Sequence, residues 1–310
     1  MNILYIDHGG YTSDNHMYQY YGDLLRQLKT MANVFLFEGD VRKMVDMVKK
    51  TDVEFDCIVF GLGYFAQSTP GCYEKIPGLS EIDAPVVCML HKPQTMLEEK
   101  INFCKLNNAD ILLDYFHNSD KGAAPRSVRS WFTANPETFH PRDIPVVFDI
   151  GFSGADHGRG KIKGATKDLR SKVGEFLKGN MKYKTFWNSS HDLSYRIPSV
   201  EEYASKINSC KIWLATTGPV NDISPRYFEV ALSKTLLFCN NIPKVNNPVF
   251  IDGVTCVTFS NDMSDFEEKL DYYLKNDIER EKIINNAYDL VYNKYTWNHM
   301  AKNLLEEIRK

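Results

Sequence analysis

The sequence lacks the long apolar segment that a membrane-spanning helix needs. Such a helix takes about 18 or more consecutive apolar residues, and the 310 residues contain no run of this length. The first residues, MNILYIDHGG, also lack the basic region and the cleavage site of a secretory signal peptide. We therefore expect a cytoplasmic protein without a transmembrane segment.

Paired cysteines and an excess of positive charge are absent as well. The seven cysteines are scattered, and none belongs to a C-x-x-C pair, so we expect neither a disulfide framework nor a zinc site. The 37 Lys and Arg residues face 40 Asp and Glu residues, giving a formal net charge of -3. Because nucleic-acid binding draws on positive charge, we expect no nucleic-acid partner.

What the sequence does contain is a regular alternation of strand and helix patterns. In the first half, apolar runs predict buried strands at 2–7, 33–37, 56–63, 85–91 and 109–115. Apolar residues at helical spacing lie between several of these runs. This order predicts a parallel sheet covered by helices on both faces.

The same alternation restarts after a proline-rich segment at 134–145, which reads as a hinge. We therefore predict an α/β protein with two Rossmann-like, doubly wound domains, at 1–140 and 141–290. Two amphipathic helices, marked by Phe266 and Trp297, are expected to close the chain.

Ligands of such sheets bind at the carboxyl ends of the strands, so the loops behind the first-domain strands are candidate sites. Asp14 lies in the loop behind the first strand, and His91 ends the fourth strand. Either could take a proton from an acceptor hydroxyl, although each could also be purely structural. The GLG run at 61–63 has no helix directly behind it and reads as a turn.

The first strand of the second domain leads into a basic, glycine-rich loop, GFSGADHGRGKIKG at 151–164. Such a loop can present backbone N–H groups and positive charge to a phosphate. Ser153, Gly154 and Lys161 are therefore candidate ligand-binding residues. The alternative is a flexible, solvated loop.

A second candidate loop, TTGPVNDISPRYFE at 216–229, joins a strand to a helix. Thr217 and Gly218 end the strand, while Ser224 and Pro225 are typical of the cap and first turn of the helix. The free N–H groups and the dipole of a helix N-terminus suit a diphosphate. We expect the phosphates of a ligand to bind here.

Arg226 and Glu229 lie one turn apart at the start of this otherwise apolar helix. Arg226 would add a bidentate cation for a phosphate, and Glu229 would accept hydrogen bonds from ribose hydroxyls. The alternative is an i,i+3 charge pair on the helix surface. No Asp-x-Asp pair that could hold a divalent ion follows a strand, so we expect metal-independent chemistry.

The stretch ISPRYFEVALSKTLLFCNN at 223–241 resembles the nucleotide-sugar motif of GT-B glycosyltransferases, closest to the group 1 type and the spore-maturation-protein-like branch. WFTANPETFHP at 131–141 is similar to the interdomain segment of this family, and the tail from Asp265 is similar to its terminal helices. The resemblance implies a GT-B fold in which a terminal helix at 291–310 packs back on the first domain.

The resemblance also implies a hexosyl- or pentosyltransferase that moves a sugar from a nucleotide sugar to a glycan, glycoprotein or small-molecule acceptor, without a further cofactor. It adds Tyr227, inside the motif, to the binding residues. Family members carry Glu-x7-Glu; Glu229 matches the second Glu, and Asn221 stands in place of the first as a candidate catalytic residue. The inverting or retaining outcome stays open. The alternatives are a DNA-base glycosyltransferase and a sugar-nucleotide-binding protein that has lost catalysis.

Overall fold

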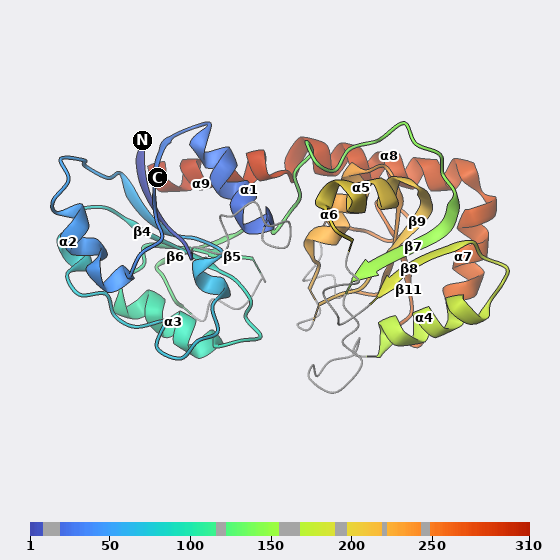
Figure 1. Ribbon diagram of the computed structural model, residues 1–310, viewed down its shortest axis with the longest axis horizontal. Helices are drawn as coiled ribbons and strands as arrows, with labels where there is room; N and C mark the ends of the chain where they lie inside the picture. Colours follow the sequence, from blue (N-terminus) through green and yellow to red (C-terminus); the bar gives the residue numbers. More distant parts are fainter. Residues whose placement is uncertain (9–18, 116–121, 155–167, 190–196, 219–221, 243–248) are drawn as a thin grey trace. The chain divides into compact units, whose positions relative to one another are not determined.

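The chain folds into two compact units (Figure 1). Unit 1 comprises Met1–Phe132 and Trp297–Lys310, and unit 2 comprises Thr133–Thr296. The domain boundaries predicted at 140/141 and 290/291 compare with 132/133 and 296/297 in this division. The computed structural model describes residues 1–8, 19–115, 122–154, 168–189, 197–218, 222–242 and 249–310.

Unit 1 is built on a parallel sheet in the order β2-β1-β3-β4-β5-β6. Its central strands are buried on both faces, as expected for a sheet covered by helices. The strand bounds are β1 Asn2–Ile6, β2 Asn33–Phe37, β3 Cys57–Phe60, β4 Val86–Leu90, β5 Ile111–Asp114 and β6 Arg126–Arg129.

The helices of unit 1 include α9, which comes from the end of the chain and packs against α1. One contact between them joins Asn298 Nδ2 to Gln27 Oε1 at 3.3 Å. The bounds are α1 Gln19–Lys29, α2 Met44–Val48, α3 Leu97–Leu106 and α9 Trp297–Arg309, with 3-10 turns at Val41–Lys43, Tyr64–Ala66 and Leu79–Glu81.

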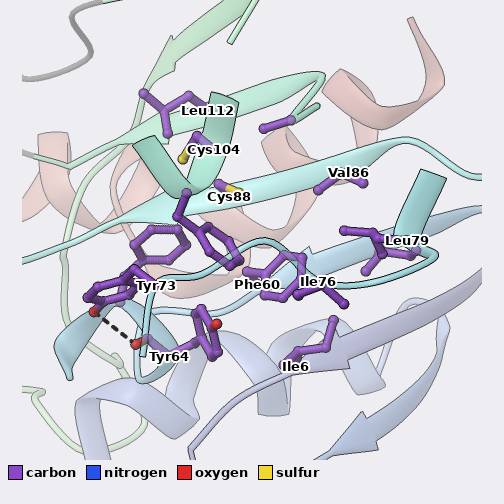
Figure 2. Packing of buried hydrophobic residues seen from close by; sticks show 14 of the residues in the cluster. Ile6, Phe60, Tyr64, Tyr73, Ile76, Leu79, Val86, Cys88, Cys104 and Leu112 are labelled. Carbon is purple, nitrogen blue, oxygen red and sulfur yellow. Dashed lines mark hydrogen bonds between the residues drawn. The ribbon is translucent and has the colours of Figure 1, made fainter. Parts of the chain in front are cut away.

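The segment between β3 and β4 is anchored in the core of unit 1. Figure 2 shows Tyr64, Tyr73, Ile76 and Leu79 packed together with strand residues such as Phe60. The Tyr73 hydroxyl donates to the Tyr64 carbonyl at 3.2 Å. These buried side chains hold a long connection against the sheet.

Unit 2 repeats the architecture with a parallel sheet in the order β11-β10-β9-β7-β8. Together the two parallel sheets confirm the predicted pair of Rossmann-like α/β domains. The strand bounds are β7 Phe148–Gly154, β8 Thr185–Ser189, β9 Cys210–Ala215, β10 Leu236–Asn240 and β11 Val257–Phe259.

The end of the chain forms three helices, so the prediction of two was wrong. The missed helix is α8, whose buried residues (Arg280, Ile283, Ala287 and Val291) occupy only one position per turn. So narrow an apolar stripe is easily overlooked in a sequence. The helices of unit 2 are α4 Leu169–Gly179, α5 Val200–Asn208, α6 Pro225–Leu232, α7 Phe266–Lys275 and α8 Asp277–Lys294.

Among the described helices, none combines the length and the hydropathy that a membrane crossing requires. All seven cysteines are free thiols, and six of them are buried.

A close approach inside the sheet of unit 2 requires glycine at position 151. Gly151 on β7 pairs with Trp213 on β9, whose ring is fully buried. A Cβ at this position would lie 2.5 Å from Cys210 Sγ and 2.6 Å from the Trp213 ring. The indole therefore occupies the space that any larger residue would need.

We predict that Gly151→Ala lowers the free energy of unfolding by about 1–3 kcal/mol, because it overpacks the core. Urea denaturation followed by tryptophan fluorescence measures this. Gly179→Ala is the matched control, since no atom lies within 4 Å of a Cβ there. Equal losses in the two variants would contradict the explanation.

Candidate functional site

The predicted binding residues of unit 2 gather where the strand order of its sheet reverses. β7 has β8 on one side and β9 on the other, and ligands of doubly wound sheets bind beside such a reversal. Ser153 and Gly154 end β7, whereas Thr217 and Gly218 follow β9. A Cβ on Gly154 would lie 3.0 Å from Arg226 Nη2, so the start of α6 reaches the end of β7.

The described residues at the two ends of the loop behind β9 make polar contacts. Thr217 N donates to Asn240 Oδ1 at 2.9 Å, and Asn240 Nδ2 donates back to Thr217 Oγ1 at 3.2 Å. Gly218 N donates to the Asp222 carbonyl at 3.0 Å, which brings the two ends of the loop together. These contacts hold the residues that follow β9 close to Asp222, which precedes α6.

The first turn of α6 has the predicted backbone but not the predicted side-chain cap. Ser224 is the N-cap residue in extended conformation, and Pro225 stands at the first helical position. The Ser224 hydroxyl is buried and has no hydrogen-bond partner among the described residues. The side chain of Ser224 therefore does not cap this turn; Pro225 has no N–H group, and the Tyr227 N–H donates to the Ser224 carbonyl at 3.1 Å.

Two guanidinium groups lie against the ring of Phe152 at this edge of the sheet. The guanidinium carbon (Cζ) of Arg226 and that of Arg170 each lie 5.6 Å from the centroid of the Phe152 ring. Arg170, in the first turn of α4, donates from Nε to Thr216 Oγ1 at 2.6 Å. The arrangement concentrates positive charge where β7 and β9 end, which suits a diphosphate.

The sequence reasoning missed Arg170. Its signal was modest: an arginine at the start of the helix that follows the glycine-rich basic loop. Only the packing of α4 brings this side chain onto Phe152, beside Arg226.

Glu229 lies one turn after Arg226 on α6 and accepts a hydrogen bond from Tyr203 of α5. The Tyr203 hydroxyl donates to Glu229 Oε2 at 2.9 Å and accepts from Arg226 Nε at 3.3 Å. Only 1% of Glu229 is exposed, so Arg226 and Glu229 are not a solvated surface pair. Burial, and next the charge of Glu229, raise the pKa of Tyr203, which stays a neutral donor. That Glu229 binds the ribose of a nucleotide stays a prediction.

Tyr227, the remaining predicted residue of α6, faces the interior. Its side chain is fully buried, with the ring 5.5 Å from that of Phe250. Burial raises the pKa of its hydroxyl well above the usual value. A contact with a ligand would require the neighbouring packing to change.

In unit 1, His91 lies at the end of β4 and is 2% exposed. Its Nε2 is 3.3 Å from the Tyr21 hydroxyl, and its ring packs edge-on against Tyr21 and Phe132. Burial, followed by the charges of Lys92 and Lys100, lowers its pKa, so the imidazole is neutral. A neutral ring is the form that a proton acceptor needs.

Three predicted residues, Asp14, Lys161 and Asn221, lie outside the described residues. The GLG run at 61–63 forms a turn, as predicted. In the part of the chain that the structure describes, no group of three His, Cys, Asp or Glu side chains could hold a metal ion.

Comparison with known proteins supports the predicted resemblance for unit 2. A family model described as "Glycosyl transferase-like" matches residues 163–306, a range that includes Arg170, Tyr203 and the whole of α6. No curated protein sequence matches the chain.

Solved structures match along the whole length of the chain. HepE of Anabaena, in complex with UDP, matches with a TM-score of 0.65 and 11% sequence identity. An alpha-glucosyltransferase in complex with UDP and a 13-mer DNA matches with a TM-score of 0.64 and 12% sequence identity. Each match covers 100% of both chains. Sucrose-phosphate synthase of Thermosynechococcus elongatus matches with a TM-score of 0.63 and 9% sequence identity, and the match covers 100% of this chain and 98% of that one. The chain therefore has the two-domain GT-B fold of glycosyltransferases, while the spore-maturation-protein-like branch stays a prediction.

We predict that Tyr203→Phe lowers the free energy of unfolding by about 1–3 kcal/mol, because buried Glu229 loses a hydrogen-bond donor. Urea denaturation measures the change. Tyr272→Phe is the control, since Tyr272 is 49% exposed and should shift the value by less than about 0.5 kcal/mol. An unchanged Tyr203→Phe variant would show that the hydroxyl does not stabilise Glu229.

Proposed function

We propose that this protein is a glycosyltransferase that moves a sugar from a nucleotide-sugar donor to a hydroxyl acceptor. The observation that carries the proposal is the pair of guanidinium groups on Phe152, from Arg170 and Arg226, next to the N-terminus of α6. In the reaction, the bond from the anomeric carbon to the diphosphate breaks and a bond to the acceptor oxygen forms. The two cations and the helix dipole would stabilise the charge of the leaving diphosphate.

The first donor to test is UDP-glucose. HepE was solved with UDP and with UDP-glucose, and the alpha-glucosyltransferase was solved with UDP. These ligands belong to those proteins, but the shared fold makes uridine nucleotides the natural starting point for this chain. Glu229 would contact the ribose if Tyr203 exchanges its hydrogen bond for one to the ligand.

The acceptor and the exact transfer are also part of the proposal. We propose a hexosyl or pentosyl transfer to a glycan, a glycoprotein or a small molecule, with His91 or Asp14 as base if the enzyme inverts. The alpha-glucosyltransferase was solved with DNA, so a modified DNA base is the second candidate acceptor. A protein that binds the donor without catalysis is the remaining alternative.

We predict that Arg226→Ala weakens UDP binding roughly 10- to 100-fold, the equivalent of losing charge-assisted hydrogen bonds worth about 1.5–3 kcal/mol. Isothermal titration calorimetry measures the affinity, and Arg170→Ala should act in the same direction. Lys178→Ala is the control, because Lys178 is an exposed cation at the other end of α4. Undiminished UDP binding in Arg226→Ala would overturn the assignment of the site.

We further propose that no metal ion takes part, because the two guanidiniums supply the positive charge that a divalent ion would supply. Hydrolysis of UDP-glucose in the absence of acceptor should then proceed equally with EDTA and with added Mg²⁺. Binding of UDP-glucose without any turnover would identify a binding protein instead of an enzyme.

A further inference from the structure

Unit 1 contains a pocket of about 850 Å³ that lies outside the predicted site residues. Its size falls in the range of sites that bind small molecules. The residues that line it come from the ends of three strands: Asp7 and His8 behind β1, residues 38–42 behind β2, and residues between 64 and 76 behind β3.

The pocket lies at the reversal of strand order in the sheet of unit 1. β1 has β2 on one side and β3 on the other. Asp7, the residue that follows the carboxyl end of β1, lines the pocket. Doubly wound sheets bind ligands at this point. The position of the pocket therefore indicates a binding site independently of its residues.

Asp7 is a buried carboxyl group of this pocket, with 4% of the residue exposed. Its Oδ1 accepts from the backbone N–H of His8 at 2.7 Å. Its Oδ2 forms no close, well-aligned hydrogen bond with the described residues, while the backbone N–H groups of Tyr64 and Gly63 interact with the carboxyl group and favour its charged form. A buried carboxyl oxygen whose hydrogen bonds are incomplete is costly to the fold, and a donor on a ligand would complete them.

The surroundings of Asp7 keep it partly protonated near neutral pH. Burial is the main cause that raises its pKa to about 7, and the charge of Glu38 behind β2 adds to this. The charge of Asp7 also contributes to the raised pKa of Tyr5 on β1. Among the described groups that shift its pKa, none is a cation.

The charge of the pocket selects against anionic ligands. Four carboxyl side chains line it (Asp7, Glu38, Asp40 and Glu74) against two cations, Arg42 and Lys75. Arg42 is already paired with Asp40, with 2.9 Å between Nε and Oδ1. A phosphate or carboxylate would face net repulsion here, while a hydroxyl or ammonium group would find acceptors.

One wall of the pocket is preformed. Tyr64 and Ile76 line the pocket and belong to the buried cluster of Figure 2. The Tyr64 hydroxyl donates to the Cys72 carbonyl at 3.0 Å, and the single O–H of Tyr73 is shared between the carbonyls of Gln67 at 3.0 Å and Tyr64 at 3.2 Å. A ligand therefore does not have to order this wall.

We propose that this pocket binds a polyhydroxylated compound without phosphate or carboxylate groups, a neutral or amino sugar, with Asp7 accepting a hydrogen bond from one of its hydroxyl or ammonium groups. The role of that sugar as the acceptor rests on the proposed function, whereas its binding does not. A DNA acceptor would place phosphates near four carboxyl groups and is disfavoured at this pocket.

The test uses the full chain and nine probes: glucose, galactose and mannose, with the 2-amino and 6-phosphate derivative of each. Titrations followed by NMR should show binding of at least one neutral or amino sugar, and at least tenfold weaker binding of its 6-phosphate. Asp7→Asn should weaken the binding roughly tenfold. Asp83→Asn, an exposed aspartate outside the pocket lining, should leave it unchanged.

The pH dependence gives a second readout. Affinity of the unmodified protein for a neutral sugar should rise from pH 6 to pH 8 as Asp7 ionises, and it should stay flat in Asp7→Asn. The raised pKa also means that folding favours the protonated carboxyl, so stability is lost as the pH rises from about 4 to about 7, and the loss is complete at pH 8. Asp7→Asn should therefore melt higher than the unmodified protein at pH 8 and close to it at pH 4, which shows that the variant folds.

Tighter binding of a 6-phosphate, equal sugar binding by Asp7→Asn, or no binding of any probe would overturn the proposal. UDP titrations keep its failure separate from that of the proposed function. Asp7→Asn should bind UDP normally, and Arg226→Ala should bind the sugar normally, because the two residues belong to different units. A chain that binds the sugar but not UDP would refute the proposed donor site alone.

Discussion

The candidate donor site depends on the packing of two arginines against one aromatic ring. Arg170 and Arg226 come from different helices, and their like charges repel each other. The π face of Phe152 offsets part of this repulsion, and the hydroxyls of Thr216 and Tyr203 accept hydrogen bonds from the two groups. Positive charge gathered in this way favours an anionic ligand.

The position of Phe152 is in turn set by the core of unit 2. Its ring stacks on Trp187 of β8, with the centroids 4.5 Å apart. Trp187 fits there because Gly174 on α4 leaves room: a Cβ at Gly174 would lie 2.8 Å from the indole. Gly174 and Arg170 are one turn apart on the same helix, so the packing that seats Trp187 also brings Arg170 to the site.

The fold was predictable because its strands and helices follow simple patterns. The central strands, β3 and β4 among them, are buried on both faces and read as continuous apolar runs. Most helices carry a broad apolar stripe, and α8 escaped notice because its stripe is narrow. The N-terminus of α6 was also readable, since Ser224 and Pro225 mark a helix start by local backbone preference.

Local sequence patterns were therefore sufficient to predict the two Rossmann-like units, the start of α6 and Arg226 as a candidate binding residue. It could not reveal Arg170, Tyr203 or Asp7, because each gains its importance from residues far away in the chain. Tyr203 matters through Glu229, Arg170 through Phe152 and Thr216, and Asp7 through its burial beside Gly63 and Tyr64. Whether a polar side chain is solvated, paired or buried depends on its neighbours in space, and only the tertiary structure supplies them.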